Sequence, residues 1–170
     1  PAPQAGSPPP AGRSQLSGDV VFNENITIYA GNRLPLYDKG PIKAYTARGT
    51  GGVYPTLFAM ISEDHLTPRI LKTPNYAAVI NPSLVTLVAA GPVMWPPAGR
   101  EKFCYIFENK LGNALIPNDL RGGLGLKPDL VMNGVIKPLI NTLADMRDKD
   151  IVHGNIRPAN LFDGGNRALD

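Results

Sequence analysis

His153-Gly154-Asn155-Ile156-Arg157-Pro158-Ala159-Asn160-Leu161-Phe162 is the most informative run of this chain. The side chains before it follow a helical pattern, because apolar residues recur at three- and four-residue steps. These residues are Leu130, Val131, Val135, Leu139, Leu143 and Met146. We expect one amphipathic helix over about 129–149, kinked or short of one hydrogen bond at Pro138. Ile151-Val152 should form a short strand leading into the run, and Leu161-Phe162 a strand that turns back through Asp163-Gly164 into a return strand over 167–169.

The part of the chain before this helix has the pattern of short strands. Runs rich in β-branched and aromatic residues occupy 20–22, 26–29, 42–47, 57–62, 84–90 and 103–108. Gly31-Asn32 and Gly91-Pro92 are typical of turns at the ends of such strands. The stretch over 69–80 has room for one or two helical turns, because Pro74 interrupts it and Pro82 follows it. The pattern therefore predicts an α+β fold.

The run at His153 resembles the catalytic loop of protein kinases, H-R-D-L-K-P-x-N. His153, Pro158 and Asn160 match that motif, and the preceding helix has a suitable length. The likeness covers roughly residues 30–170 in the order of elements, and it is specific only from Leu130 onward. It implies a protein-kinase-like fold with a β-rich N-lobe, one long helix, and the catalytic-loop hairpin of a truncated C-lobe.

Several kinase groups are replaced in this sequence. The Asp that accepts the substrate proton in that loop is Asn155 here, and an amide is no proton acceptor at pH 7. Phe58-Ala59-Met60-Ile61 is similar to the strand motif V-A-I-K and puts Ile61 in the lysine position, or Ser62 after a shift of one residue. The turn over 37–42 has one glycine where kinases have G-x-G-x-x-G. The resemblance thus implies that no residue is catalytic, with Asn155 and Ile61 as degenerate positions.

Two loop residues keep a chemistry that the family uses. By resemblance, Asn160 matches the Asn that holds a magnesium ion, and Arg157 replaces a Lys that holds the transferred phosphate. Both are candidate cofactor-binding residues for ATP, and Asn160 is the candidate metal ligand. His153 is expected to be structural. No D-F-G segment follows before Asp170.

Composition excludes several classes of protein. The net charge of +3 comes from scattered Lys and Arg residues, so we expect no binding of nucleic acid. Cys104 is the only cysteine, and its apolar neighbours favour a buried thiol. No apolar run is long enough for a transmembrane segment, and no signal peptide is recognisable. We therefore expect a cytoplasmic location, alone or as the cytosolic part of a larger protein.

These patterns divide the chain into three parts. Residues 1–18 form a Pro-rich segment, which we expect to be a flexible linker. Residues 19–108 form the β-rich N-lobe, and 109–170 the hinge, helix and catalytic-loop part of a truncated C-lobe. An open lower lobe would expose the apolar face of the 130–146 helix, so a homo-oligomer or another protein partner should cover it.

Three functional hypotheses are compatible with the sequence. The first is a pseudokinase domain, which acts as a scaffold or regulatory protein-binding module without phosphotransfer and needs no cofactor. The alternative is an atypical serine/threonine protein kinase, or a weak binder of ATP and magnesium with a rearranged active site. The third is a plain β-rich interaction module whose loop likeness is accidental, which predicts that residues 153–160 do not lie at a cleft between two lobes.

Overall fold

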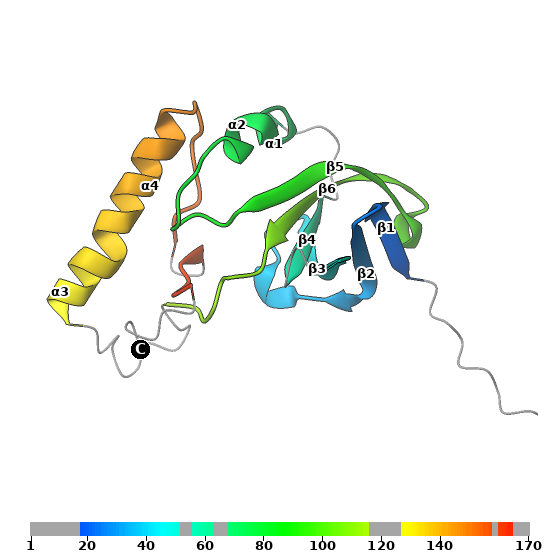
Figure 1. Ribbon diagram of the computed structural model, residues 1–170, viewed down its shortest axis with the longest axis horizontal. Coiled ribbons are helices and arrows are strands. Elements are labelled where there is room, and N and C mark those ends of the chain that lie inside the picture. The colour runs from blue at the N-terminus through cyan, green and yellow to red at the C-terminus, as the bar shows by residue number, and fades with distance from the viewer. Residues whose placement is uncertain (1–17, 52–55, 63–67, 116–126, 158–159, 165–170) are drawn as a thin grey trace, which may run out of the picture.

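The computed structural model describes residues 18–51, 56–62, 68–115, 127–157 and 160–164 (Figure 1). The fold is α+β, with an antiparallel sheet of six strands and a long helix. The strands are β1 (Asp19–Asn23), β2 (Ile26–Arg33), β3 (Ile42–Gly49), β4 (Leu57–Ser62), β5 (Leu87–Trp95) and β6 (Arg100–Glu108). Their order in the sheet is β1-β2-β3-β4-β6-β5.

The sheet is barrel-like, because its two outer strands approach each other. The ring of Phe22 on β1 lies beside Gly91 on β5, where a Cβ built on that glycine would be 3.8 Å from the Phe22 Cζ atom. The core fills the inside of this curved sheet, and its members are Val20, Ile26, Ile28, Tyr45, Ala47, Leu57, Ala59, Ile61, Val93, Trp95, Cys104 and Ile106. Burial of Cys104 is thereby confirmed, and burial raises the pKa of its thiol.

Two predicted turns are wrong because strands run through them. β2 continues past Gly31-Asn32, and its pairing with β3 shifts in register between Ile28 and Arg33, an irregularity that glycine favours. β5 continues through Gly91 and Pro92 to Trp95 instead of ending near residue 90. Pro92 is tolerated because β5 is an edge strand, with β6 as its partner in the sheet.

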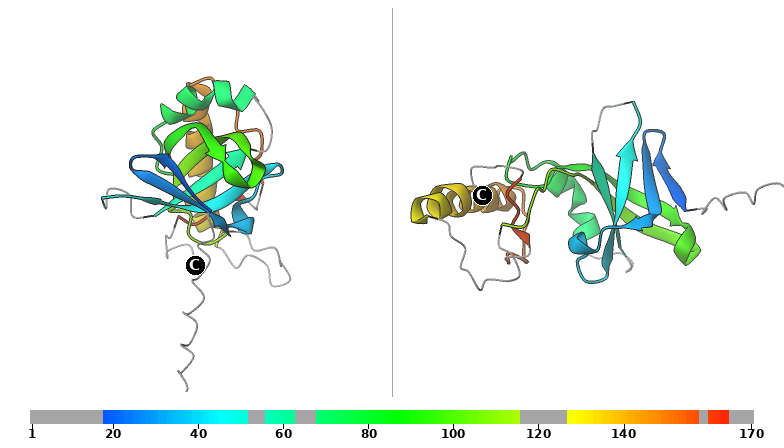
Figure 2. Two further views of the ribbon diagram at one scale, coloured as in Figure 1. Left: turned by 90° about the vertical axis from the view of Figure 1, so that its right-hand side faces the viewer. Right: turned by 90° about the horizontal axis from the view of Figure 1, so that it is seen from below.

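The long helix lies at the end of the molecule away from β1 (Figures 1 and 2). The long helix combines α3 (Pro128–Val131), a π-helical turn η3 (Met132–Ile136) and α4 (Lys137–Arg147). Pro138 has no N–H and its ring would crowd the carbonyl group four residues earlier, so the wider turn before it keeps the helix continuous. No helix in the described ranges is both long and apolar enough to cross a bilayer.

Short helices join the sheet to the long helix. The predicted helical turns over 69–80 are confirmed as α1 (Pro68–Leu71) and α2 (Thr73–Ala77). Polar contacts join this region to α4 and to the residues that follow it. Asn81 Nδ2 donates to the Asp145 carboxylate at 2.6 Å, Asn75 Nδ2 donates to the Lys149 carbonyl oxygen at 2.9 Å, and Lys72 pairs with Asp150.

The chain after the helix differs from the prediction. The described residues 151–157 contain no strand, so Ile151-Val152 does not pair with a neighbour. Phe162 forms a single β-bridge with Ala114, and the Leu115 N–H donates to the Leu161 carbonyl oxygen at 2.9 Å. The predicted return strand over 167–169 lies outside the described residues. The loop is thus attached to the segment that follows β6.

Candidate functional site

The site forms where the β2–β3 turn meets the loop after the long helix. The Lys39 ammonium group donates to the Asn160 side-chain oxygen Oδ1 at 2.5 Å, across 121 positions of sequence. The Asn160 Nδ2 group donates to the backbone carbonyl oxygen of Asn155 at 2.8 Å. Asn155, Arg157 and Asn160 are thus brought together, and Lys39 joins them from the other part of the fold.

The hairpin that carries Lys39 is held by its own acidic residue. The Asp38 carboxylate accepts from the Ala44 N–H at 2.9 Å and from Arg33 at 2.5 Å, and Lys43 lies 3.6 Å away. Burial works against ionisation of this carboxyl, but the Ala44 hydrogen bond and the Arg33 charge lower its pKa overall. Gly40 adopts a left-handed conformation at φ 58°, which suits a tight turn. This arrangement commits Asp38 to the hairpin and leaves Lys39 at its tip.

Positive charge accumulates at the tip of the hairpin. Burial lowers the pKa of Lys39, and the nearby Arg157 charge lowers it further. The Arg157 side chain is exposed, and no hydrogen bond or ion pair engages its guanidinium among the described residues. Two cations beside an amide attract anions, whereas a metal ion would be repelled. The Asn160 oxygen that was the candidate metal ligand accepts from a cation in this arrangement.

Metal-binding chemistry has no further support in the described ranges. They contain no group of three or more His, Cys, Asp or Glu side chains that could hold a metal ion. A divalent ion that replaced Lys39 at Asn160 would therefore need other ligands.

An aromatic row fills the space beside the loop. Tyr37 lies between two rings, with centroid distances of 5.2 Å to Phe58 on β4 and 6.0 Å to Phe162 of the loop. Phe58 stacks on Phe107 of β6 at 5.4 Å, and Phe107 meets Tyr76 of α2 at 6.1 Å. The row therefore runs without a break from the loop, across the sheet, to the short helices.

Ile61 does not belong to this cluster. Side chains alternate along β4, so Leu57, Ala59 and Ile61 enter the core, and Phe58 joins the aromatic row on the opposite face. Ile61 is fully buried at 0% exposure. A side chain at position 61 therefore enters the core, whereas positions 60 and 62 share the face of Phe58.

The His153 ring contacts the backbone of the loop. Its Nδ1 atom accepts from the Asn155 N–H at 3.3 Å, which requires that nitrogen to be unprotonated. Burial lowers the pKa of His153, so the neutral ring is favoured at neutral pH. The ring thereby helps to hold the backbone of the loop that presents Asn155 to Asn160.

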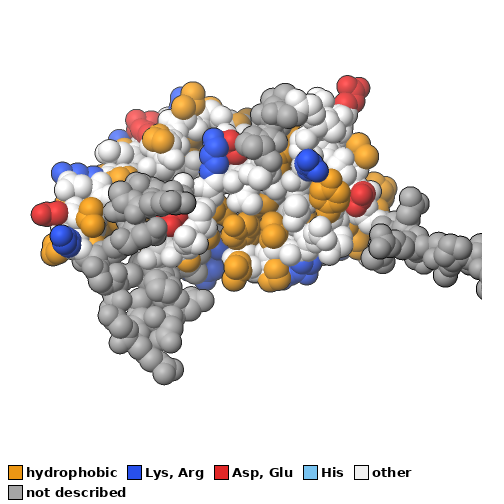
Figure 3. All heavy atoms as spheres, turned by 60° about the horizontal axis from the view of Figure 1, so that its bottom comes forward, with side chains coloured by type: hydrophobic (Ala, Val, Ile, Leu, Met, Phe, Trp, Pro, Cys, Tyr) orange, Lys and Arg blue, Asp and Glu red, His pale blue; other side chains and the backbone are white. Residues whose placement is uncertain are grey.

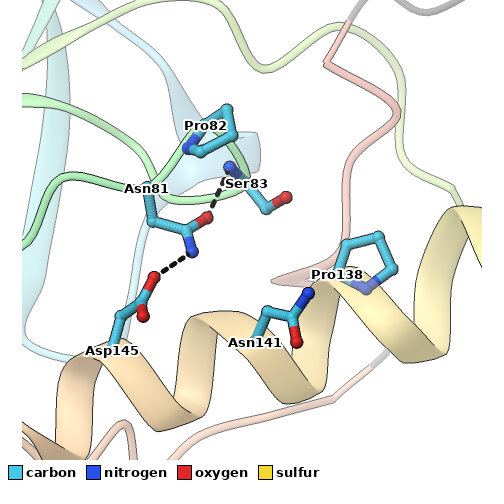
Figure 4. A pocket seen from close by; sticks show the side chains of 6 residues that line it. All are labelled: Asn81, Pro82, Ser83, Pro138, Asn141 and Asp145. Atoms are coloured by element: carbon cyan, nitrogen blue, oxygen red, sulfur yellow. Dashed lines mark hydrogen bonds between the residues drawn. The ribbon is translucent and has the colours of Figure 1, made fainter.

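A separate pocket of about 490 Å³ lies between the turn before β5 and the long helix (Figure 4). It is lined by Asn81, Pro82, Ser83, Pro138, Asn141 and Asp145. Sequence analysis found neither this pocket nor the role of Lys39. The pair Asn81-Pro82 is a turn signal, but nothing local indicates that this turn meets a helix some sixty residues later.

A search against protein-family models and a search of curated proteins both found no match to this chain.

Proposed function

We propose that this chain is a pseudokinase domain, which binds a protein partner and does not transfer phosphate. The observation that carries the proposal is the closure of the β2–β3 turn onto the loop. In kinases this turn covers the phosphates of the nucleotide. Here Tyr37 lies between Phe58 and Phe162, and Lys39 donates to Asn160, so the chain's own side chains occupy the space beneath the turn.

The chemistry of the loop supports the same proposal. Asn155 provides no proton acceptor for a substrate hydroxyl. Its backbone carbonyl oxygen accepts a hydrogen bond from the Asn160 side chain, so the residue helps to hold the shape of the loop. Arg157 and Lys39 add charge but no base. The contact of Asn160 with Lys39 supports the pseudokinase proposal over the third hypothesis, in which the likeness of the loop is accidental.

A specific observation favours the alternative of weak nucleotide binding. Lys39 and Arg157 are two neighbouring cations, and phosphate groups bind to such pairs. A nucleotide would have to displace Tyr37 from between the two phenylalanine rings and Lys39 from Asn160. We therefore propose that ATP binding, where it occurs, is weak and independent of magnesium.

The partner-binding part of the proposal concerns the long helix. Met132, Ile136 and Ile140 recur at four-residue steps and have exposures of 50, 37 and 59%. On the face that Figure 3 shows, the larger gathering of hydrophobic side chains lies near the middle of the molecule, away from the left end where the long helix lies, so the stripe formed by these three residues is a separate feature. We propose that a protein, or a second copy of this chain, covers the stripe formed by these three residues. Light scattering behind size-exclusion chromatography tests self-association, and Ile140→Lys should convert any dimer to monomer.

Calorimetric titration tests the main proposal. ATP with magnesium should give no saturable heat at ligand concentrations up to about 1 mM, a range that covers ordinary substrate affinities. Radiolabelled ATP should leave no label on the chain or on added protein substrates. The matched variant is Tyr37→Ala, which empties the space between Phe58 and Phe162. Magnesium-dependent binding to the unmodified chain, with transfer abolished by Asn155→Ala, would overturn the proposal.

A further inference from the structure

The pocket between the turn over 81–83 and the long helix has two distinct walls (Figure 4). One wall is Asn81-Pro82-Ser83, and the other consists of Pro138, Asn141 and Asp145. The spacing of three and seven residues puts the helical members on one side of α4. Its volume of about 490 Å³ lies within the range of small-ligand sites, and it is open to solvent, with Ser83, Asn141 and Asp145 exposed.

The pocket is held in shape by its own hydrogen bonds. The Ser83 N–H donates to the Asn81 side-chain oxygen at 2.8 Å, and the Thr142 hydroxyl shares its proton between the same oxygen at 3.1 Å and the Pro138 carbonyl oxygen at 2.8 Å. The Asn81 Nδ2 group donates to one oxygen of Asp145 at 2.6 Å. Asn81 therefore binds the turn to the helix, and the walls are preorganised before any ligand arrives.

The groups that remain for a ligand are one carboxylate, which only accepts, and two neutral groups that can also accept. Among the described residues, no cation pairs with Asp145, and one of its carboxylate oxygens accepts no hydrogen bond. The Asn141 amide and the Ser83 hydroxyl are likewise unengaged there. A carboxylate without a cation, next to an amide and a hydroxyl, favours a positively charged donor. A single carboxylate is a poor site for a metal ion, so an organic cation fits better.

The apolar part of the pocket narrows the class of cation. The rings of Pro82 and Pro138 offer flat apolar surface beside the polar groups. A guanidinium group is planar, less strongly hydrated than an ammonium group, and able to donate twice to one carboxylate. Exposed isoleucines adjoin both walls in sequence, since Ile80 is 94% and Ile140 59% exposed. These two isoleucines would be covered if the cation were a side chain of a bound polypeptide.

We propose that this pocket is a receptor site for an arginine side chain presented by a partner protein, with Asp145 as its charged ligand and Asn141 and Ser83 as further acceptors. The inference deepens the proposed function, because it names a surface through which a protein-binding domain would engage its partner.

The test uses the full chain and defined probes. N-acetyl-arginine-N-methylamide, titrated into the isotopically labelled protein, should shift the amide NMR signals of Asn81, Ser83 and Asn141 with a Kd on the order of millimolar. The citrulline counterpart, which is neutral and similar in shape, should give no saturable shift. A Leu-Arg-Ile peptide should bind at least about fivefold tighter than the single residue, and Ile80→Ser should remove that gain.

Two variants isolate the carboxylate. Asp145→Asn retains an oxygen that accepts from Asn81, so the turn should hold and the melting temperature should change little. Its affinity for the arginine probe should fall at least about tenfold. Asp129→Asn removes the same charge from the same helix outside the pocket, and it should bind as the unmodified chain does.

Equal affinity for citrulline, or an unchanged affinity in Asp145→Asn, would overturn the proposal. If the Leu-Arg-Ile peptide bound no more tightly than the single arginine residue, the proposal of a protein partner would be wrong. The pocket would then be a site for a small ligand that contains a guanidino group. These outcomes are separate from the nucleotide titration. A chain that binds ATP and transfers phosphate contradicts the pseudokinase proposal whatever happens at this pocket.

Discussion

A charge placed at position 61 tests which side of β4 faces the loop. Ile61 is fully buried within the core, and Met60 is half-buried on the opposite face of the same strand. Ile61→Lys puts an ammonium group among apolar side chains, while Met60→Lys leaves its charge a route to water along the lysine stem. The two variants differ by one residue in position and carry the same new side chain, so each is the control of the other.

The magnitudes follow from burial. Removing most of a fully buried isoleucine costs about 2–5 kcal/mol, and an unpaired buried charge adds several more. The total for Ile61→Lys approaches the whole stability of an ordinary domain, about 5–15 kcal/mol, so we expect this variant to be largely unfolded. Ile61→Ala keeps the test measurable, with an expected loss of about 3 kcal/mol and roughly 6–12 °C in melting temperature. Met60→Lys should lose about 1–2 kcal/mol.

The assay uses the single tryptophan of the chain. Trp95 is 2% exposed, and its ring lies 4.8 Å from that of Tyr45 in the core. Its fluorescence in a urea titration therefore reports unfolding of the sheet. If Ile61→Lys folded as stably as Met60→Lys, or gained affinity for ATP, the assignment of position 61 to the core would be refuted. A gain in ATP affinity would support the correspondence of position 61 to the kinase lysine that the resemblance implies.

Three further predictions concern the loop, the hairpin and the thiol. Because the pKa of His153 is lowered on folding, its contribution to stability should be intact above about pH 6.5 and should be lost as the pH falls through the lowered value. His153→Asn keeps an acceptor for the Asn155 N–H and should remove this dependence in urea titrations at pH 5 and 7.5; an unchanged slope would contradict it. A double-mutant cycle of Lys39→Met and Asn160→Leu should give a coupling of about 1–2 kcal/mol, and additive losses would show that the contact contributes nothing. Cys104 should react with a thiol reagent only after denaturation, and fast labelling of the native chain would disprove its burial.

Local sequence patterns predicted the helices and strands well where the burial of one apolar face determines the structure. Runs of β-branched, aromatic and other apolar residues marked five of the six strands near their observed positions, and the helical spacing from Leu130 marked the long helix. Strand ends were less predictable, because Gly31 and Pro92 are turn signals in isolation. Both are accommodated by the sheet, Gly31 where the register shifts and Pro92 on an edge.

The candidate site was predictable only in part. The loop residues were found because they are neighbours in sequence. Lys39 and the Asn81 turn were missed because their roles depend on contacts across 121 and more than sixty positions, which no local pattern encodes. The side of β4 on which Ile61 lies was unpredictable for another reason. A short apolar strand such as Phe58-Ala59-Met60-Ile61 does not reveal which of its two faces enters the core when both are covered.

The π-helical turn at Met132–Ile136 also changes the directions in which side chains leave the helix. In a regular helix each step of four residues drifts by about 40°, so a row in strict fours would spiral away from its neighbours. The wider turn absorbs part of that drift and keeps Met132, Ile136 and Ile140 closer to one line. Forcing this turn into regular winding without removing a residue would rotate the side chains before it relative to those after it, and the three apolar residues would no longer lie near one line. A partner bound along that line would then lose its contacts with the first turn of the helix, while the sheet remained intact.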